Sequence, residues 1–279
     1  MIIGLDASGT FAALEVDGFE CSAVAAVALP TSTRDEVRNW TESKLGEWRR
    51  AGLRELHAQE MDWPERLETC QMLSERDDIH VAVVLTNSML LRSPGAVANH
   101  RKRQLQFAEE SLAGATSDAG RRRGEAVCRL QAASASVKAA SSDQDYVRGA
   151  MAPRAIFDGV QRAICFFAGQ KWRAEMVGFE VLVDKDTPPS LRYIAGTLLP
   201  VLGSDAQRFQ WIMPEHWSEE PEHPLLVASR HPDGDGYWAK GVLGEGIEPM
   251  SSEKEPAIQV ADIAAWVAWT PPTLSPKAA

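Results

Sequence analysis

Cysteine is scarce in this chain and is not arranged as a metal-binding motif. The four cysteines (Cys21, Cys70, Cys128 and Cys165) are widely separated, and no two of them form a C-x-x-C pair. Scattered cysteines of this kind indicate reduced thiols rather than zinc ligands or a disulfide framework. We therefore expect a cytoplasmic protein.

Long apolar runs and nucleotide-binding glycine motifs are also missing. No apolar stretch reaches the length of a transmembrane helix, and the N-terminus lacks the basic and apolar regions of a signal peptide. Neither G-x-G-x-x-G nor G-x-x-x-x-G-K-[ST] occurs, which argues against dinucleotide-binding and P-loop folds. These absences predict no membrane partner, and 279 residues suit one large domain or one domain with an insertion.

Charge is distributed unevenly along the chain. The net charge is −10, which at first sight argues against binding to nucleic acid. Residues 88–177, however, contain 14 Lys and Arg against 8 Asp and Glu, whereas the rest contains 15 basic against 31 acidic residues. A basic segment on an acidic body is compatible with a nucleic-acid partner, and also with ordinary solvated helix faces.

The hydrophobic patterns and turn signals indicate an α/β protein. The expected strands lie over residues 2–6, 11–16, 21–29, 79–86, 179–184 and 209–213. The expected helices lie over residues 31–50, 62–75, 97–113, 121–140, 144–174, 188–202 and 256–269. Alternation is weak in the fourth strand, which we therefore place in the centre of the sheet. Residues 214–255 are expected to form a long loop with short elements at most.

The element order distinguishes between two α/β folds. A Rossmann-type fold requires a crossover helix after its first strand, and residues 7–30 leave no room for one. A ribonuclease H-like fold begins with a three-strand meander, so we expect such a mixed sheet flanked by helices. Residues 1–87 and 178–270 would form the core, 88–177 a large basic helical insertion, and 271–279 a disordered tail.

Three aspartates lie at places where a sheet could gather them. Asp6 and Asp184 each end an apolar run, and Asp262 lies in an almost wholly apolar helix in which Gln259 shares its face. Several carboxylates in one place repel one another unless a cation lies between them, so we predict a site for Mg²⁺ or Mn²⁺. The alternative is that each aspartate makes an ordinary turn, cap or loop hydrogen bond.

Two further groups of side chains are candidates for the same chemistry. Glu55 and His57 would share one side of an extended segment and could provide a fourth ligand or a general acid or base. The basic clusters of the predicted insertion could hold phosphates, although solvated helix faces are the more common outcome. The residues of these clusters are Arg101, Lys102, Arg103, Arg121, Arg122 and Arg123.

Together these motifs resemble the DUF3800 family, over almost the whole chain. The motifs are Asp6-Ala7-Ser8-Gly9, the strand-ending Asp184, the segment Glu55-Leu56-His57-Ala58, and Gln259-Val260-Ala261-Asp262. The resemblance implies a ribonuclease H-like core and a metal-dependent phosphodiesterase. This chain has Ala7 where the family usually has Glu, which leaves open whether one or two metal ions bind.

The sequence thus favours a nuclease in which Asp6, Asp184 and Asp262 hold one or two Mg²⁺ or Mn²⁺ ions. Glu55 or His57 would orient or deprotonate the attacking water, and the insertion would bind the backbone of the nucleic acid. Two alternatives stay open. One is a non-catalytic nucleic-acid or protein binding module on the same fold, and the other is a metal-dependent hydrolase of a small nucleotide.

Overall fold

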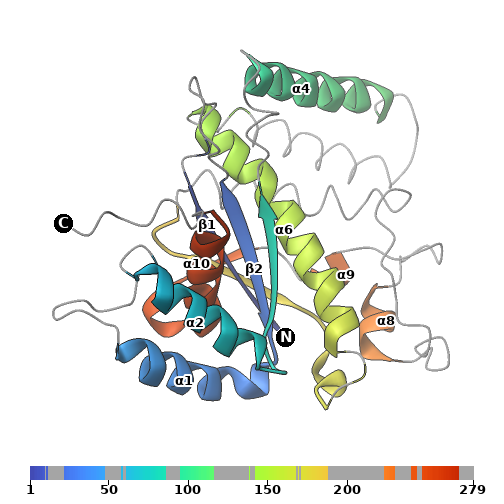
Figure 1. Cartoon of the computed structure of the whole chain (residues 1–279). Helices are drawn as coiled ribbons and strands as arrows, with labels where there is room; N and C mark the ends of the chain where they lie inside the picture. Colours follow the sequence, from blue (N-terminus) through green and yellow to red (C-terminus); the bar gives the residue numbers. More distant parts are fainter. Residues whose placement is uncertain are drawn as a thin grey trace, which may run out of the picture.

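The computed structural model consists of a mixed β-sheet with helices on both faces (Figure 1). It describes residues 1–9, 11, 22–47, 58, 61–85, 95–115, 138, 142–167, 169, 171–187, 223–229, 240–243 and 247–269. Within these residues, no helix is both long and apolar enough to cross a membrane. An α/β class with a mixed sheet flanked by helices agrees with the expectation from the sequence.

The elements follow one another in the order β, β, α, α, β, α, α, β, α, α, β, α. The strands are β1 (Ile2–Ser8), β2 (Ala23–Leu29), β3 (His80–Leu85), β4 (Glu180–Asp184) and β5 (Ile247–Met250). The helices are α1 (Arg34–Gly46), α2 (Trp63–Ser74), α4 (Ala96–Ala115), α6 (Asp143–Phe167), α8 (Pro224–Ser229), α9 (Lys240–Leu243) and α10 (Pro256–Trp269). Single 3₁₀ turns occur at Thr31–Thr33, Arg173–Glu175 and Ser252–Lys254.

The sheet has five strands in the order β3-β2-β1-β4-β5. β1 is antiparallel to β2, and β2 is antiparallel to β3. β4 is parallel to β1 and β5 is parallel to β4. The central strand β1 therefore has one antiparallel and one parallel neighbour, which makes the sheet mixed.

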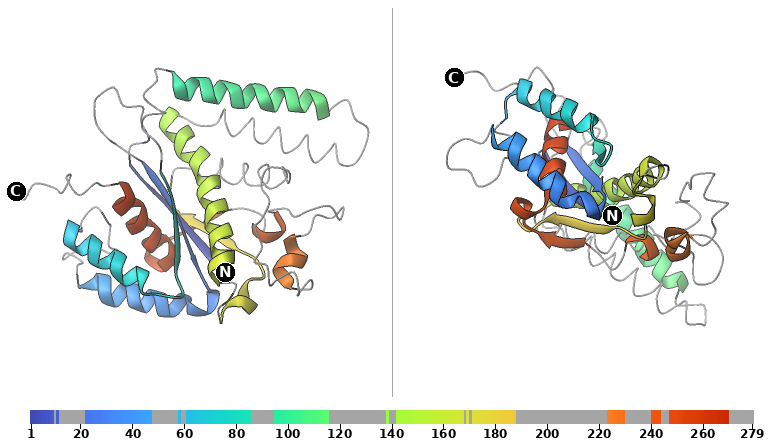
Figure 2. Two further views of the ribbon diagram at one scale, coloured as in Figure 1. Left: turned by 45° about the vertical axis from the view of Figure 1, so that its right-hand side comes forward. Right: turned by 90° about the horizontal axis from the view of Figure 1, so that it is seen from below.

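The two faces of the sheet have separate cores because strand side chains alternate. Ile3 and Leu5 of β1 pack with α6, α8 and α9 on one face. Ile2 of β1 packs with α1, α2 and α10 on the other, and Figure 2 shows these helices on the side of the sheet opposite to α6. All seven residues of β2 are buried, as expected for a strand covered by helices on both faces.

Glycines allow the helices to approach the sheet closely. A Cβ on Gly4 of β1 would lie 2.3 Å from the backbone carbon of Ala257 at the start of α10. A Cβ on Gly159 of α6 would lie 2.9 Å from Cβ of Ala26 on β2. Both glycines are therefore required by packing rather than by backbone conformation, and they bring α10 and α6 almost into backbone contact with the sheet.

Local sequence signals predicted several elements correctly. The helix expected over 62–75 is α2, and Asp62 and Glu65 form a capping box at its start, with Pro64 in its first turn. The closing helix α10 spans Pro256–Trp269 as expected. The strand expected over 179–184 is β4, and the helix expected over 97–113 is α4.

Other expectations were wrong, and each has a tertiary reason. β3 lies at one edge of the sheet rather than in its centre, and Val83 and Leu85 on it are 37% and 50% exposed. Its apolar composition therefore reflects the cover that α6 gives to one face and not two neighbouring strands. β5 was not predicted, because its four residues include Pro249 and pair with β4 only at the other edge of the sheet.

The proposed boundary between core and insertion also needs correction. Residues 88–177 were expected to form one helical insertion, but α6 within them packs against β1, β2 and β3. Its apolar stripe belongs to the core of the protein. α4 is different, because Figure 1 shows it apart from the sheet, near the upper end of α6. The helix expected to continue to residue 174 ends at Phe167.

Several predicted elements lie outside the described residues. These are the strand over 11–16 except for Phe11, the helix over 121–140 except for Lys138, the helix over 188–202, the strand over 209–213 and the tail 271–279.

Candidate functional site

Asp6 and Asp184 lie side by side on neighbouring strands. Leu5 of β1 pairs with Val183 of the parallel strand β4, so the two aspartates are the next residues along each strand. Adjacent strands lie about 4.8 Å apart, and residues in register on them share a face. The predicted meeting of these two carboxylates at one end of the sheet therefore follows from the strand pairing.

Asp262 approaches the same place from α10. Asp6 lies on the face of β1 that carries Ile2 and Gly4, and this is the face that α10 covers. Ile258, one helical turn before Asp262, is buried in the core between α10 and the sheet. All three aspartates are partly buried. Residues separated by up to 256 positions in the sequence thus approach the same end of the sheet.

The pKa of Asp6 is affected by both of the other aspartates. Burial and the charge of Asp262 raise the pKa of the Asp6 carboxyl well above its ordinary value, and the charge of Asp184 raises it further. A hydrogen bond from the amide of Ala7 and the positive charge of Arg148 lower the pKa in part. The fold therefore disfavours three ionised carboxylates in this place.

Each carboxylate also accepts a hydrogen bond from a backbone amide. Ala7 N donates to Asp6 Oδ1 at 2.7 Å, Asp186 N to Asp184 Oδ1 at 3.0 Å, and Ala58 N to Asp262 Oδ2 at 3.0 Å. The side chains are oriented by these bonds. Within the described residues, no three acidic, His or Cys side chains are close enough together to form a ligand set.

A divalent cation fits these residues in chemistry. Carboxylate oxygens are the donors that Mg²⁺ and Mn²⁺ prefer, and a cation would relieve the repulsion that raises the pKa of Asp6. One oxygen each of Asp6 and Asp184 makes no hydrogen bond to a described residue. The charges of Asp262 and Asp184 both act on Asp6, so the three side chains lie within electrostatic range of one another.

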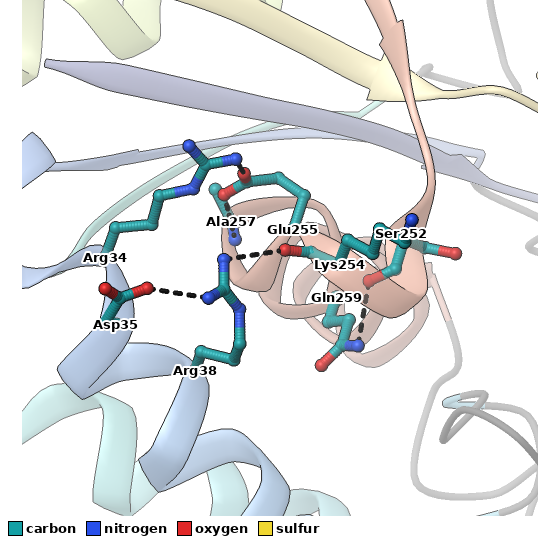
Figure 3. Close-up of polar contacts among 8 residues, drawn as sticks. All are labelled: Arg34, Asp35, Arg38, Ser252, Lys254, Glu255, Ala257 and Gln259. Carbon is teal, nitrogen blue, oxygen red and sulfur yellow. Dashed lines mark hydrogen bonds and ion pairs between the residues drawn. The ribbon is translucent and has the colours of Figure 1, made fainter.

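The start of α10 is fixed by α1, which determines where Asp262 lies. Figure 3 shows Arg34 of α1 pairing with the fully buried carboxylate of Glu255 at 2.5 Å. Glu255 in turn accepts a hydrogen bond from the amide of Ala257 at 3.2 Å. Burial raises the pKa of Glu255, while the amide of Ala257 and the Arg34 guanidinium oppose the rise. This ion pair between a half-buried arginine and a buried glutamate therefore holds the N-terminus of α10 in place.

Gln259, which shares a helical face with Asp262, forms its side-chain hydrogen bond with the turn before α10. Its side chain donates to the carbonyl of Ser252 at 2.8 Å, and this bond is drawn in Figure 3. Arg38 of α1 donates to the carbonyl of Lys254 at 3.0 Å in the same turn. Gln259 thus stabilises the turn that precedes α10.

Glu55 and His57 lie outside the described residues, so their predicted roles stay predictions. Ala58, the residue that follows His57, does lie at the site. Its amide donates to Asp262, and its methyl group packs with Met61 and Ile263. Ala58 thus brings this segment into contact with α10 next to Asp262.

The three basic residues on α4 have different environments. The guanidinium of Arg101 lies 5.7 Å from the ring centroid of Tyr146 on α6 and 3.9 Å from Asp143. Lys102 and Arg103 are exposed. Arg121, Arg122 and Arg123 of the second predicted cluster lie outside the described residues.

Sequence reasoning did not single out Arg148, which belongs to this end of the sheet. It lies in α6, and its charge acts on Asp6 from the face opposite to α10. Its guanidinium carbon is 4.8 Å from the ring centroid of Phe11. No motif marks Arg148, because only the packing of α6 brings it to the end of β1.

Comparison with known proteins gave no match. No protein-family model, no curated protein and no solved structure resembles the chain closely enough to report.

Proposed function

We propose that the protein is a metal-dependent phosphodiesterase that cleaves nucleic acid. The observation that carries this proposal is the convergence of Asp6, Asp184 and Asp262 on one end of the sheet, where Asp262 and Asp184 raise the pKa of Asp6. Structural proteins seldom keep carboxylates together without a compensating charge, whereas metal-dependent active sites require them. The resemblance of the sequence motifs to the DUF3800 family supports the same assignment.

A ribonuclease H-like core is part of this proposal. Two features of the sheet support it. β1 and β2 are antiparallel neighbours that precede every crossover helix. Asp6 lies near the end of β1, beside the parallel strand that carries Asp184. An acid on the first strand, beside a parallel strand with a second acid, is expected of such a fold. The expected three-strand meander is not what the described part of the structure has, because β2 pairs directly with β1 and the third antiparallel strand, β3, follows α1 and α2.

In the proposed mechanism, Asp6, Asp184 and Asp262 would hold one or two Mg²⁺ or Mn²⁺ ions. An ion bound there would supply an activated water and neutralise charge on the phosphate. The residues of the chain have separate tasks: the three carboxylates are oriented by the amides of their neighbours, and Glu55 or His57 accepts the proton of the attacking water. Residues of α4 such as Lys102 and Arg103 would contact the backbone of the nucleic acid.

The test is metal-dependent cleavage by Asp6→Asn and Asp262→Asn variants. We expect each substitution to lower the rate by about a hundredfold or more, because each removes a metal-ligating charge and keeps the shape of the side chain. Cleavage of labelled DNA and RNA is measured with and without Mn²⁺, and circular dichroism checks the fold. Glu68→Gln on the exposed side of α2 is the control. Full activity in both Asn variants would reject the assignment.

One observation favours a second function, a non-catalytic binding module. All three carboxylates accept backbone hydrogen bonds, as structural turn and loop residues do. A calorimetric titration with Mn²⁺ separates the two functions, because the module would bind no ion. A cleavage activity confined to mononucleotides would instead indicate a small-nucleotide hydrolase, and the affinity for its substrate would depend only weakly on salt.

A further inference from the structure

Arg148 has a buried polar atom for which no described residue is a partner. Its Nε is shielded from solvent and donates no hydrogen bond to a described residue. Within the described part of the chain, its guanidinium forms no ion pair closer than 4.0 Å. Leaving such a donor unsatisfied lowers the stability of the fold. Orphaned donors of this kind are uncommon in native proteins and require an explanation.

The aromatic ring beneath Arg148 is held in an unusual backbone conformation. Phe11 is buried and has a φ of 51°, in the left-handed region that residues other than glycine rarely adopt. Its amide donates to Ser22 Oγ at 2.7 Å, which holds this conformation. The ring of Phe11 lies 4.8 Å from the guanidinium carbon of Arg148. Phe11 therefore limits the positions that this side chain can take.

Charges of opposite sign thus meet at one end of the sheet from two different layers. The carboxylates belong to β1, β4 and α10, and the guanidinium belongs to α6 on the other face. A phosphate group bound through a cation on the carboxylates would present its remaining oxygens to such a guanidinium. Arginine suits this task because its planar fork can donate two hydrogen bonds to phosphate oxygens.

We infer that Arg148 binds a non-bridging oxygen of the substrate phosphodiester beside Asp6, Asp184 and Asp262. This inference rests on the proposed function and adds to it the group that recognises the phosphate. The contact is to the backbone of the nucleic acid. Arg148 therefore contributes to the affinity for every nucleotide sequence and does not distinguish one sequence from another. The competing explanation is that Arg148 only offsets the negative charge of Asp6.

The test compares Arg148→Ala and Arg148→Lys with the wild-type protein. Arg154→Ala is the matched control, because Arg154 is exposed on the same helix and pairs with Asp158 at 2.9 Å, away from the carboxylates. Fluorescence anisotropy measures the affinity for a labelled oligonucleotide of about twenty nucleotides in the presence of Mn²⁺. The measurement is made in the cold and is completed while gel electrophoresis shows that the oligonucleotide is still intact. Calorimetry measures the affinity for Mn²⁺ alone.

We expect Arg148→Ala to weaken binding of the oligonucleotide about tenfold or more, and to lower the slope of affinity against salt by about one. Its affinity for Mn²⁺ should equal or exceed that of the wild type, because a nearby positive charge is removed. Arg148→Lys keeps the charge and the bulk of the side chain, and it should recover only part of the affinity. Arg154→Ala should change neither affinity.

Other results overturn the inference in distinguishable ways. If Arg148→Ala and Arg148→Lys bind the oligonucleotide as the wild type does, Arg148 does not contact phosphate, and the proposed function stands. If Arg148→Ala lowers the affinities for Mn²⁺ and for the oligonucleotide together and Arg148→Lys restores both, Arg148 is only a counter-ion to Asp6. If Arg148→Ala does not fold, the same comparison is made with Arg148→Lys. If the wild type binds no Mn²⁺, the proposed function is rejected and the inference with it.

Discussion

Asp6 shows how a single residue can be placed at a cost to stability. Its carboxyl is partly buried and lies near the carboxylates of Asp262 and Asp184. The burial and each of the two negative charges favour the protonated form of Asp6. The hydrogen bond from Ala7 and the charge of Arg148 offset only part of this effect. A group that weakens the fold at neutral pH is expected where function, and not stability, determines the residue.

Replacing Asp6 with Asn should therefore stabilise the protein. We expect Asp6→Asn to raise the free energy of unfolding by about 1 kcal/mol near neutral pH in the presence of EDTA. Asn can still accept the hydrogen bond from the amide of Ala7. Urea unfolding of both proteins provides the measurement, with Glu68→Gln as an exposed control that should be neutral.

The same pair of proteins should differ in pH dependence. Because the pKa of Asp6 is raised in the fold, the favourable contribution of its protonated form is fully present below the unfolded pKa of about 3.9. This contribution is lost as the pH rises through the folded-state pKa. The advantage of Asp6→Asn should thus shrink as the pH is lowered. A difference that stays constant with pH, or a less stable Asn variant, would contradict the assignment of the strain to Asp6.

At the scale of elements, the site depends on how closely α10 lies against β1. Gly4 permits this contact, since a Cβ there would lie 2.3 Å from the backbone of Ala257. Gly4 and Asp6 share one face of β1, and Asp262 lies further along the same helix that Gly4 contacts. The ion pair of Arg34 and Glu255 holds the helix at this distance from its N-terminal end.

A methyl group at position 4 should therefore disturb both the fold and the site. We expect Gly4→Ala to lower the free energy of unfolding by about 2 to 3 kcal/mol, because backbone atoms of α10 must move away. The displacement should also weaken the coupling between Asp6 and Asp262, and with it the affinity for Mn²⁺. Urea unfolding and calorimetry measure the two effects.

Gly46 provides the matched control for this substitution. A Cβ on Gly46, at the end of α1, would meet nothing within 4 Å. Gly46→Ala should accordingly change the free energy of unfolding by less than about 1 kcal/mol. If the two substitutions had equal effects, close packing of α10 on β1 would not be the reason for glycine at position 4.

At the scale of the whole molecule, folding concentrates negative charge at one end of the sheet. The chain carries a net charge of −10, and acidic side chains near the ends of β1 and β4 lie within electrostatic range of Asp262 in the middle of α10. Assembling them works against folding, and a ligand that binds only the assembled state would favour it. The stability of the protein and the occupancy of the proposed site are therefore linked.

Divalent cations should consequently stabilise the folded protein. At a free Mn²⁺ concentration of about one hundred times Kd, we expect a gain of about 2.7 kcal/mol in the free energy of unfolding. The gain should be larger near pH 7 than near pH 5, because protons compete for the carboxyl of Asp6. Thermal unfolding with Mn²⁺, and with NaCl at the same ionic strength, measures the effect. An equal gain in Asp6→Asn would place the ion elsewhere.

Local signals explain the parts of the fold that could be predicted. The capping box of Asp62 and Glu65, the proline that begins α10 and the apolar runs of β1, β2 and β4 depend on neighbours in the sequence. β3 and β5 are edge strands, and each pairs with a single neighbouring strand. Their positions in the sheet therefore depend on residues far away in the sequence. Periodicity does not contain that information.

The sequence by itself determined the class of the protein and the residue types of the site, because strand and helix patterns are local and because each aspartate ends or interrupts an apolar run. Only the tertiary structure decided which side chains meet. Parallel pairing placed Asp184 beside Asp6, the close approach at Gly4 brought α10 with Asp262, and α6 brought Arg148 over Phe11. These contacts join residues far apart in the chain, so their energies arise from packing and pairing that no local pattern specifies.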